Sequence, residues 1–498
     1  MGTPAVTSGG QVWLRYGSGP GRWVLLGTVL GSAMASIDAT VVGIALPTIG
    51  HDFHIGLADL QWVVTAYTLT LAGLLLFAGA LGDKYGRKRV FLAGVVWFAV
   101  ASALCAAAPN APVLIAARAV QGIGAALLTP GSLAIIEASF HPDDRGKAIG
   151  AWSGLSGVGS AIGPFLGGWL IQAGSWRLIF VINLPLAALV VAVGLRHIPE
   201  SRDPDATGKL DVTGSVLITL GLVGLTYGLI EGPAAGWLRP GPLAALAAGA
   251  ALLAAFVLWE RRAPSPMLPL SLFSSAQFTS ANVVTFVVYA ALGGALFLLP
   301  IQLQEVSGYT ALEAGISLLP VTVIMLVLSA RSGALAARIG PRLQMTAGPI
   351  VIAAGLALFT RVGYSGNYLT EVLPAVLVFG LGLAINVAPL TSTVLGAVPA
   401  EHAGMASAVN NDVARAASLI AVAVLPAAAG LSGASYLHPA QFTAGFHRAS
   451  LIAAGLCVIG SVVAAATIRN PRPTKAAAPA PGPLLHCGVD APPARVTG

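Results

Sequence analysis

Charged residues are scarce in this chain of 498 residues. Asp, Glu, Lys and Arg make up 9% of it, against roughly 25% in a typical soluble domain. Hydrophobic residues make up 56%. A soluble fold would have to bury these apolar runs in one core, and single cores stop growing near about 250–300 residues. The composition therefore excludes a soluble globule and predicts an integral membrane protein.

Cysteine pairs, secretion signals and catalytic motifs are also missing. Cys105, Cys457 and Cys487 lie far apart, which argues against a disulfide framework and against a structural metal site. The first apolar stretch is longer than the core of a cleavable signal peptide. The sequence contains no HExxH, GxSxG or phosphate-binding P-loop. We therefore predict that the protein is not an enzyme, holds no cofactor or metal, and draws energy from a gradient rather than from a nucleotide.

Apolar segments of about 20 residues, the length that spans a bilayer, fill most of the chain. Their number predicts an all-α integral membrane fold of fourteen transmembrane helices. The predicted spans are 23–50, 60–82, 90–108, 112–139, 148–171, 176–196, 211–230, 240–259, 278–301, 313–336, 343–363, 370–396, 404–430 and 445–468.

The basic residues predict the orientation, because cytoplasmic loops are enriched in Lys and Arg. With the N-terminus inside, nineteen of the 26 basic residues fall in cytoplasmic segments. Four fall outside, namely Arg177, Arg239, Arg361 and Arg448. This bias predicts a multi-pass protein of the cytoplasmic membrane with both termini inside, and it explains the net charge of +7 without a nucleic-acid partner.

An internal repeat predicts how the spans are grouped. The segment "GALGDKYGRKRVFLAG" (79–94) aligns without gaps to "GALAARIGPRLQMTAG" (333–348), and both follow one span and open the next. Chance similarity in Ala- and Gly-rich sequence is the alternative to duplication of a six-span half. Duplication predicts two six-helix halves with a substrate path between them. The predicted segments are a cytoplasmic N-terminus (1–22), a first half (23–196), two additional helices (211–259), a second half (278–468) and a disordered Pro/Ala-rich cytoplasmic tail (469–498).

Charges inside a bilayer are costly and mark candidate functional residues. Asp38 lies about 22 Å along the first span at 1.5 Å per residue, near mid-membrane. A carboxylate there can exchange protons or attract a cationic substrate; the alternative is a structural Asp held by a neighbouring helix. Arg118 lies in the fourth span and stays protonated. It either couples proton release to conformation or packs for assembly.

The thirteenth span carries a second polar group in "VNNDVARAAS". Asp412 and Arg415 are three residues apart and share a helix face, so they form either part of a functional site or a self-neutralising pair. Asn410 and Asn411 beside them predict a polar, water-lined patch. Three further charged residues lie near cytoplasmic span ends, where we expect side chains that reach the membrane surface; they are Glu137, Arg331 and Glu260.

The fifth span contains a periodic set of small residues, "GLSGVGSAIGPFLGGWL" (154–170). Glycine at every fourth position makes one smooth face for close helix contact, and proline favours a kink. This combination predicts a helix at a moving interface, although small-residue stripes also occur in static bundles. The candidate hinge residues are Gly154, Gly159, Gly163, Pro164, Gly167 and Gly168.

Four local patterns together resemble the major facilitator superfamily, specifically its fourteen-span drug:proton antiporters. "GALGDKYGRKR" (79–89) is similar to the loop motif between the second and third helices. "RAVQGIGAA" (118–126) resembles the fourth-helix motif, and the glycine pattern of the fifth span resembles the antiporter motif. "IDATVVGIALP" (37–47), with "WRLIFVINLP" (176–185) after the fifth helix, is similar to further family patterns. The resemblance covers residues 23–468.

The resemblance implies proton-driven export of amphipathic, often cationic compounds by alternating access. In it, Asp38 matches an acid that handles protons or substrate, Arg118 matches the proton-coupling Arg, and Gly163 and Pro164 match the hinge. Arg415 resembles a recurrent family Arg. Two positions depart from the family, with Asp412 in place of a small or neutral residue and Gly43 in place of the usual Asn. These departures leave the substrate open.

The loop at 79–89 holds five charges in residues 83–89. The basic residues, Arg87 and Lys88 among them, predict a cytoplasmic anchor, and Gly79 and Gly86 recur in the second half. Asp83 does not recur, since Ala337 stands in its place. We interpret Asp83 as a latch that accepts hydrogen bonds from a helix N-terminus or from an Arg of the other half.

The leading hypothesis is a monomeric, proton-coupled exporter of drugs or natural products that confers antibiotic resistance. The alternative is a proton-coupled importer of a polar nutrient, which would line its path with more carboxylates and amides. A third hypothesis, an intramembrane enzyme or lipid-handling protein, has no catalytic constellation behind it.

Overall fold

The structure is a computed structural model of the chain. It describes residues 6–8, 11–203, 206, 208–237, 239–399 and 402–470. Within these residues, fourteen helical segments are long and apolar enough to cross a membrane, and each coincides with one of the predicted spans. Of the tail predicted at 469–498, residues 471–498 lie outside the described residues.

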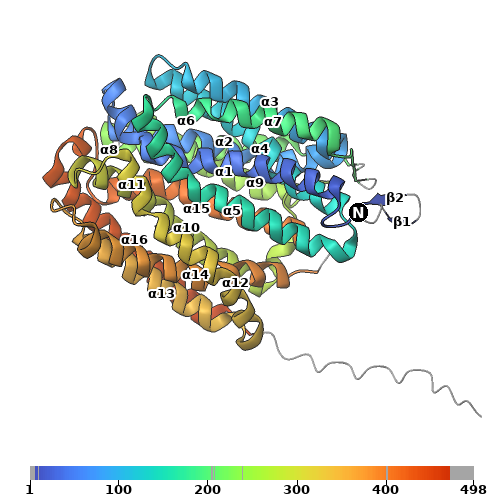
Figure 1. Cartoon of the computed structure of the whole chain (residues 1–498). Coiled ribbons are helices and arrows are strands. Elements are labelled where there is room, and N and C mark those ends of the chain that lie inside the picture. The colour runs from blue at the N-terminus through green and yellow to red at the C-terminus, as the bar shows by residue number, and fades with distance from the viewer. Residues whose placement is uncertain are drawn as a thin grey trace, which may run out of the picture.

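The helices lie side by side with their axes roughly aligned (Figure 1). The first seven are α1 (Gly19–Phe53), α2 (Leu57–Tyr85), α3 (Arg87–Ala106), α4 (Ala111–Ser139), α5 (Pro142–Ala173), the short α6 (Leu178–Val181) and α7 (Asn183–His197). The additional pair is α8 (Val212–Ala235) and α9 (Pro240–Glu260). The last group is α10 (Ala276–Ile301), continued by the π-helix η2 (Gln302–Val306), α11 (Ala311–Ser317), α12 (Leu319–Ile339), α13 (Pro341–Leu358), α14 (Leu373–Gly396), α15 (Ala403–Ala428) and α16 (Pro439–Thr467).

Several helices are longer than their predicted spans. Helix α5 begins at Pro142 rather than 148, and α16 begins at Pro439 rather than 445. The extra turns carry polar residues such as Asp143 and Asp144, which a hydropathy criterion leaves out. Outside the helical bundle, a two-stranded antiparallel hairpin, β1 (Val6–Ser8) and β2 (Gln11–Trp13), precedes α1 and was not predicted.

The same packing order occurs twice along the chain. Helix α1 packs on α5 and α7, and α10 packs on α15 and α16. Helix α4 packs on α2 and α3, and α14 packs on α12 and α13. This recurrence supports the predicted duplication of a six-helix half, which stays a prediction. We refer to α1–α7 as the first half and to α10–α16 as the second half.

The additional pair lies against both halves. Helix α8 packs on α9, on α2 of the first half and on α15 of the second half. Leu69 and Ala72 of α2, Leu222 of α8 and Leu419 of α15 form one small apolar cluster at this junction. Helix α8 therefore covers the α2–α15 contact between the halves, while α5 and α11 form a second contact.

Hydrogen bonds between the two halves gather at one end of the bundle, where α1 ends and α2 begins. Gln61 Nε2 donates to Val422 O at 2.5 Å, and the Tyr436 hydroxyl donates to Ile55 O at 2.6 Å. His51 Nε2 contacts a carboxylate oxygen of Glu305 at 2.9 Å. This end of the interface between the halves is therefore closed by direct polar contacts.

Candidate functional site

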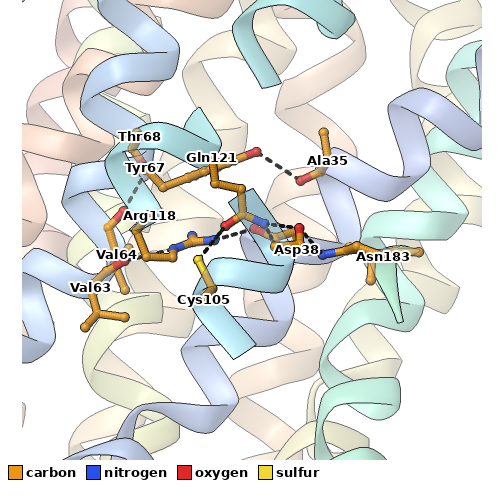
Figure 2. Close-up of polar contacts among 12 residues, drawn as sticks. Ala35, Asp38, Val63, Val64, Tyr67, Thr68, Cys105, Arg118, Gln121 and Asn183 are labelled. Atoms are coloured by element: carbon orange, nitrogen blue, oxygen red, sulfur yellow. Dashed lines mark hydrogen bonds and ion pairs between the residues drawn. The ribbon is translucent and has the colours of Figure 1, made fainter. Parts of the chain in front are cut away.

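An ion pair between α1 and α4 lies in the interior of the first half. Arg118 Nη1 is 2.5 Å from Asp38 Oδ2, and each side chain is 1% exposed. The two residues are 80 positions apart in the chain, and Figure 2 shows their side chains pointing toward one another. The structure thus brings together the two charged residues that the sequence identified separately.

Neutral donors complete the hydrogen bonding of the Asp38 carboxylate. Its Oδ1 accepts from Gln121 Nε2 at 2.8 Å and from Asn183 Nδ2 at 3.0 Å, so helices α4 and α7 both contribute. The same two amides also donate to Ser102 Oγ of α3. A buried ion pair is tolerated only when its remaining polar atoms are also satisfied, and this network meets that condition for Asp38.

The Arg118 guanidinium has further partners on α2. Its Nε donates to Val63 O at 3.1 Å, and its Cζ lies 4.3 Å from the centre of the Tyr67 ring. A cation over an aromatic face is stabilised by the ring quadrupole. The Tyr67 hydroxyl donates to Ala35 O of α1 at 3.3 Å, so that ring is itself held in place (Figure 2).

This arrangement ties the charge of Asp38 to the packing of five helices, α1, α2, α3, α4 and α7. With Asp38 ionised, the pair is neutral overall and each carboxylate oxygen accepts from at least one donor. A proton on Asp38 would leave the Arg118 charge without its counter-ion in a low-dielectric interior, which is costly. Protonation of Asp38 would therefore favour movement of α1 relative to α4 or entry of water.

Sequence reasoning missed Ser102, Gln121 and Asn183 as members of this site. Gln121 and Asn183 both lie inside the motifs quoted above, "RAVQGIGAA" and "WRLIFVINLP". An amide side chain within a membrane span is a signal that would have found them, because it needs a partner there. Ser102 carries no such signal, since serine also satisfies itself within its own helix.

The polar group on α15 is arranged differently from the one between α1 and α4. Asp412 and Arg415 are half-buried, and within the described residues neither Asp412 Oδ1 nor Arg415 Nε has a hydrogen-bond partner. Asp412 and Arg415 therefore do not form the self-neutralising hydrogen-bonded pair that was one of the two alternatives. Asn410 donates to Asn282 Oδ1 and Thr285 Oγ1 of α10, at 3.1 and 2.7 Å, and so holds α15 to α10. Asn411 is exposed and donates to Ser407 O.

The glycines of α5 allow two close helix contacts. A Cβ on Gly159 would lie 2.8 Å from the Cβ of Ala33 in α1, and Gly163 and Gly167 also face α1, at Thr40 and Val41. Gly168 faces α11 of the second half at Ala311. Gly154 has no neighbour within 4 Å of such a Cβ among the described residues. Helix α5 is thus packed closely between α1 of its own half and α11 of the other.

Pro164 leaves one carbonyl of α5 without its helical partner, and α1 supplies a replacement. Because proline has no N–H, the carbonyl four residues earlier, that of Ser160, loses its i to i−4 hydrogen bond. The Thr40 hydroxyl donates to that oxygen at 3.2 Å. Thr40 lies two residues after Asp38, so the weakened point of α5 is bonded to the same segment of α1 that carries the ion pair.

The charged loop between α2 and α3 is tied to the segment that follows α7. Arg87 is the first residue of α3, and its Nη2 is 2.7 Å from Asp83 Oδ1. In this structure the partner of Asp83 is therefore within its own motif and not an Arg of the other half. Gly86 has a φ of +116°, and the Lys88 N–H donates to Glu200 Oε1 at 3.1 Å. Gly79 packs against Pro130 of α4.

Within the described residues, no group of three or more His, Cys, Asp or Glu side chains lies close enough to hold a metal ion. We therefore name no metal ligands.

Comparisons with known proteins identify the family of this chain. A family model described as Major Facilitator Superfamily matches residues 28–424. The chain is 37% identical over 402 residues to the multidrug resistance protein Stp of Mycobacterium tuberculosis, covering 80% of this chain and 74% of that protein. It is 36% identical over 402 residues, with the same coverage, to the tetracenomycin C resistance and export protein of Streptomyces glaucescens. Among solved structures, the peptide transporter POT in complex with sulfate has a TM-score of 0.65 at 14% identity, covering 90% of this chain and 94% of that one. That last likeness concerns the fold alone.

Proposed function

This chain belongs to the Major Facilitator Superfamily of membrane transporters, and we propose that it exports drugs or amphipathic natural products from the cytoplasm in exchange for protons. Its substrates are expected to be small, amphipathic and often cationic. The protein acts as a monomer that alternates between cytoplasm-facing and outward-facing states. Like many efflux transporters, it would make its host more resistant to the compounds it removes.

The export direction is supported by the relatives. Two proteins at 36–37% identity are described as a multidrug resistance protein and as a resistance and export protein. A third relative is described as a methylenomycin A resistance protein of Bacillus subtilis. This chain is 35% identical to it over 422 residues and covers 90% of its length. A polar-nutrient importer, the alternative, has no counterpart among these three.

The observation that carries proton coupling is the buried Asp38–Arg118 pair. In this pair a carboxylate oxygen lies 2.5 Å from the nitrogen of a permanent cation, and both side chains are 1% exposed. Because protonation of Asp38 removes the counter-ion of Arg118, proton binding and helix movement are energetically linked. Such a link is what an antiporter needs in order to exchange one cargo for the other.

Alternating access is supported by the uneven distribution of contacts between the halves. Hydrogen bonds such as those of Gln61 and Tyr436 join the halves where α1 ends and α2 begins. With the N-terminus inside, as the basic residues predict, this end is the outer one. The arrangement then corresponds to a state closed to the outside, and the bonds of Gln61 and Tyr436 must break when it opens.

The test is efflux of a fluorescent cationic dye from an efflux-deficient host that produces the protein. We expect faster dye loss than in control cells, and a protonophore should remove the difference. Asp38→Asn should keep normal expression and lose coupled efflux, whereas Asp143→Asn, at a carboxylate 74% exposed, should behave as wild type. Unchanged accumulation over a broad panel of dyes and antibiotics would contradict export. Uptake of a labelled sugar or amino acid would instead favour the importer.

A further inference from the structure

Two carboxyl groups outside the proposed transport site meet at the ends of the additional helices. Asp211 precedes the first residue of α8, and Glu260 is the last residue of α9. Glu260 was expected to reach the membrane surface, and this expectation is wrong, because its side chain is buried with 3% exposed. A charged side chain is rarely buried to this degree without a partner.

Each carboxyl group has one oxygen that accepts hydrogen bonds from N–H groups. Asp211 Oδ1 accepts from the Gly214 N–H and from Trp259 Nε1, both at 2.8 Å. Glu260 Oε2 accepts from the Leu268 N–H at 3.0 Å. The donors come from the first turn of α8, from α9 and from the segment that leads toward α10, so the two groups hold three parts of the chain together.

The remaining oxygens face one another without a donor. Asp211 Oδ2 and Glu260 Oε1 are both buried and lack a hydrogen-bond partner within the described residues. A Cβ placed on Gly214 would lie 2.5 Å from the first oxygen and 2.6 Å from the second, so both line the same spot. Two ionised carboxylates so close would repel each other, and two unpaired buried acceptors would each carry a desolvation cost.

Basic side chains do not neutralise this pair. Among the ion pairs of the described residues, none includes Asp211 or Glu260. Helix α2 packs on α8 and carries Lys84. The Lys84 ammonium group donates to Gly208 O at 2.9 Å and not to either carboxylate. Other charged groups lie on the flanking segments, on α8 itself and on the helices packed against α8, namely Glu200, Arg202, Asp203, Lys209, Glu231, Arg261, Arg262, Asp59, Asp83, Asp412 and Arg415.

We propose that Asp211 and Glu260 form a proton-binding site, in which the Glu260 Oε1–H group donates to Asp211 Oδ2. One proton satisfies both orphaned oxygens and removes one of the two charges. Glu260 is the protonated partner, because it is the more deeply buried and its other oxygen accepts a single hydrogen bond. Asp211 keeps its charge beside the N-terminus of α8, where backbone N–H groups and the helix dipole favour an anion.

The same spot does not suit a metal cation. Sodium, calcium and magnesium are held by six or so oxygen ligands, whereas two carboxylate oxygens are available here. The remaining neighbours, the N–H groups of Gly214, Leu268 and Trp259, are donors that would repel a cation. A proton needs only the two facing oxygens.

Loss of this proton would loosen the connection between the additional helices and the second half. Two charged carboxylates would push the start of α8 away from the end of α9 and release the segment at Leu268. Helix α8 packs on α2 of one half and α15 of the other, so its cytoplasmic end is placed to influence both. This site is separate from Asp38 and does not depend on the proposed transport reaction.

Infrared spectroscopy on the full-length purified protein tests the proton directly. We expect a carboxylic-acid C=O band near neutral pH that is lost in Glu260→Gln and also in Asp211→Asn, because an Asn amide donates to Glu260 in place of the shared proton. Asp143→Asn, at an exposed carboxylate, should keep the band. Retention of the band in both site variants would overturn the proposal.

Thermal unfolding gives a second readout that does not require transport. The folded state holds a proton that the unfolded chain releases, so the melting temperature of the wild type should fall as the pH rises. Glu260→Gln, whose amide donates permanently to Asp211, should show a flatter dependence. An equal pH dependence in wild type and Glu260→Gln, or a melting temperature of the wild type that rises with sodium but not with potassium, would count against a proton site. If Glu260→Gln does not fold, Asp211→Asn serves for the same comparison.

Discussion

The two halves handle their buried charges in opposite ways. In the first half, Asp38 and Arg118 are paired at 2.5 Å and surrounded by amide donors. In the second half, Asp412 Oδ1 and Arg415 Nε are buried atoms without a partner within the described residues. The first pair holds helices together through its hydrogen bonds, whereas the second leaves polar atoms whose hydrogen bonding is unsatisfied, which is costly inside a protein. We propose that proton handling and substrate recognition are divided between the halves.

The loops that open the third helix of each half differ in charge but not in geometry. Gly86 and Gly340 have φ values of +116° and +84°. The N–H groups of Lys88 and Arg342, two residues further on, donate to Glu200 Oε1 and to Asn470 Oδ1, at 3.1 and 3.0 Å. Each acceptor follows the last helix of its half. The backbone arrangement is therefore similar in both halves, while Asp83 and Glu200 have no acidic counterpart in the second.

The largest expected difference between the halves concerns their arginines. Arg118→Met leaves the buried Asp38 carboxylate without its cation, which should lower the free energy of unfolding by about 3–5 kcal/mol. Arg415→Met removes no hydrogen-bonded partner and should cost about 1 kcal/mol or less. Unfolding in detergent, followed for both variants and for the double variant Asp38→Asn/Arg118→Met, measures this. Equal losses of unfolding free energy in the two single variants would contradict the difference between the halves.

A second difference is the position of the glycines that allow close packing. Where the first and fifth helices of each half meet, the glycines lie on α5 in the first half, whereas in the second half Gly293 and Gly294 of α10 face α15. Gly159→Leu collides with Ala33 and should cost about 1–3 kcal/mol, with loss of dye efflux. Gly154→Leu, where the same side chain points into open space, should keep efflux. If Gly159→Leu transports normally, the glycine stripe is spacing without a role in movement.

Substitution of Asp412 should have a smaller effect on stability and should change which substrates are exported. Asp412→Asn should change the free energy of unfolding by about 1 kcal/mol or less, because the carboxylate has an unpartnered oxygen. We expect slower efflux of cationic dyes and unchanged efflux of neutral compounds, measured side by side in the same host. Asp38→Asn should lose both. Equal slowing of both classes by Asp412→Asn would assign Asp412 to coupling rather than to recognition.

The loop carboxylate should have the smallest effect. Asp83 and Arg87 are 37% and 20% exposed, and a solvent-accessible pair of this kind contributes about 0–1 kcal/mol. Asp83→Asn should therefore express normally and show an altered rate of transport. The matched change in the second half, Ala337→Asp, should leave the rate unchanged. A wild-type rate for Asp83→Asn would reduce the loop to a topological anchor.

Much of the fold was predictable because the membrane acts locally on the sequence. Each of the fourteen spans was recognisable from about 20 neighbouring residues, and the described structure has a helix at every one. The errors were at the ends, as at Pro142 and Pro439, where polar turns extend beyond the apolar core. Motifs also marked Asp38 and Arg118 as unusual residues, because a charge within an apolar run is visible without any partner.

The partners of those residues were decided by the tertiary structure. Hydropathy indicates that a residue lies in the membrane but not which neighbouring helix it faces. The contact of Asp38 with Arg118, 80 positions away, and of Thr40 with Ser160, 120 positions away, depends on how α1 packs against α4 and α5. The same holds for Glu260, which is buried against Asp211 rather than at the membrane surface. Local composition determined which segments cross the membrane, and helix packing determined which charges meet, because a side chain's partner is set by rotations and contacts between helices that no single segment encodes.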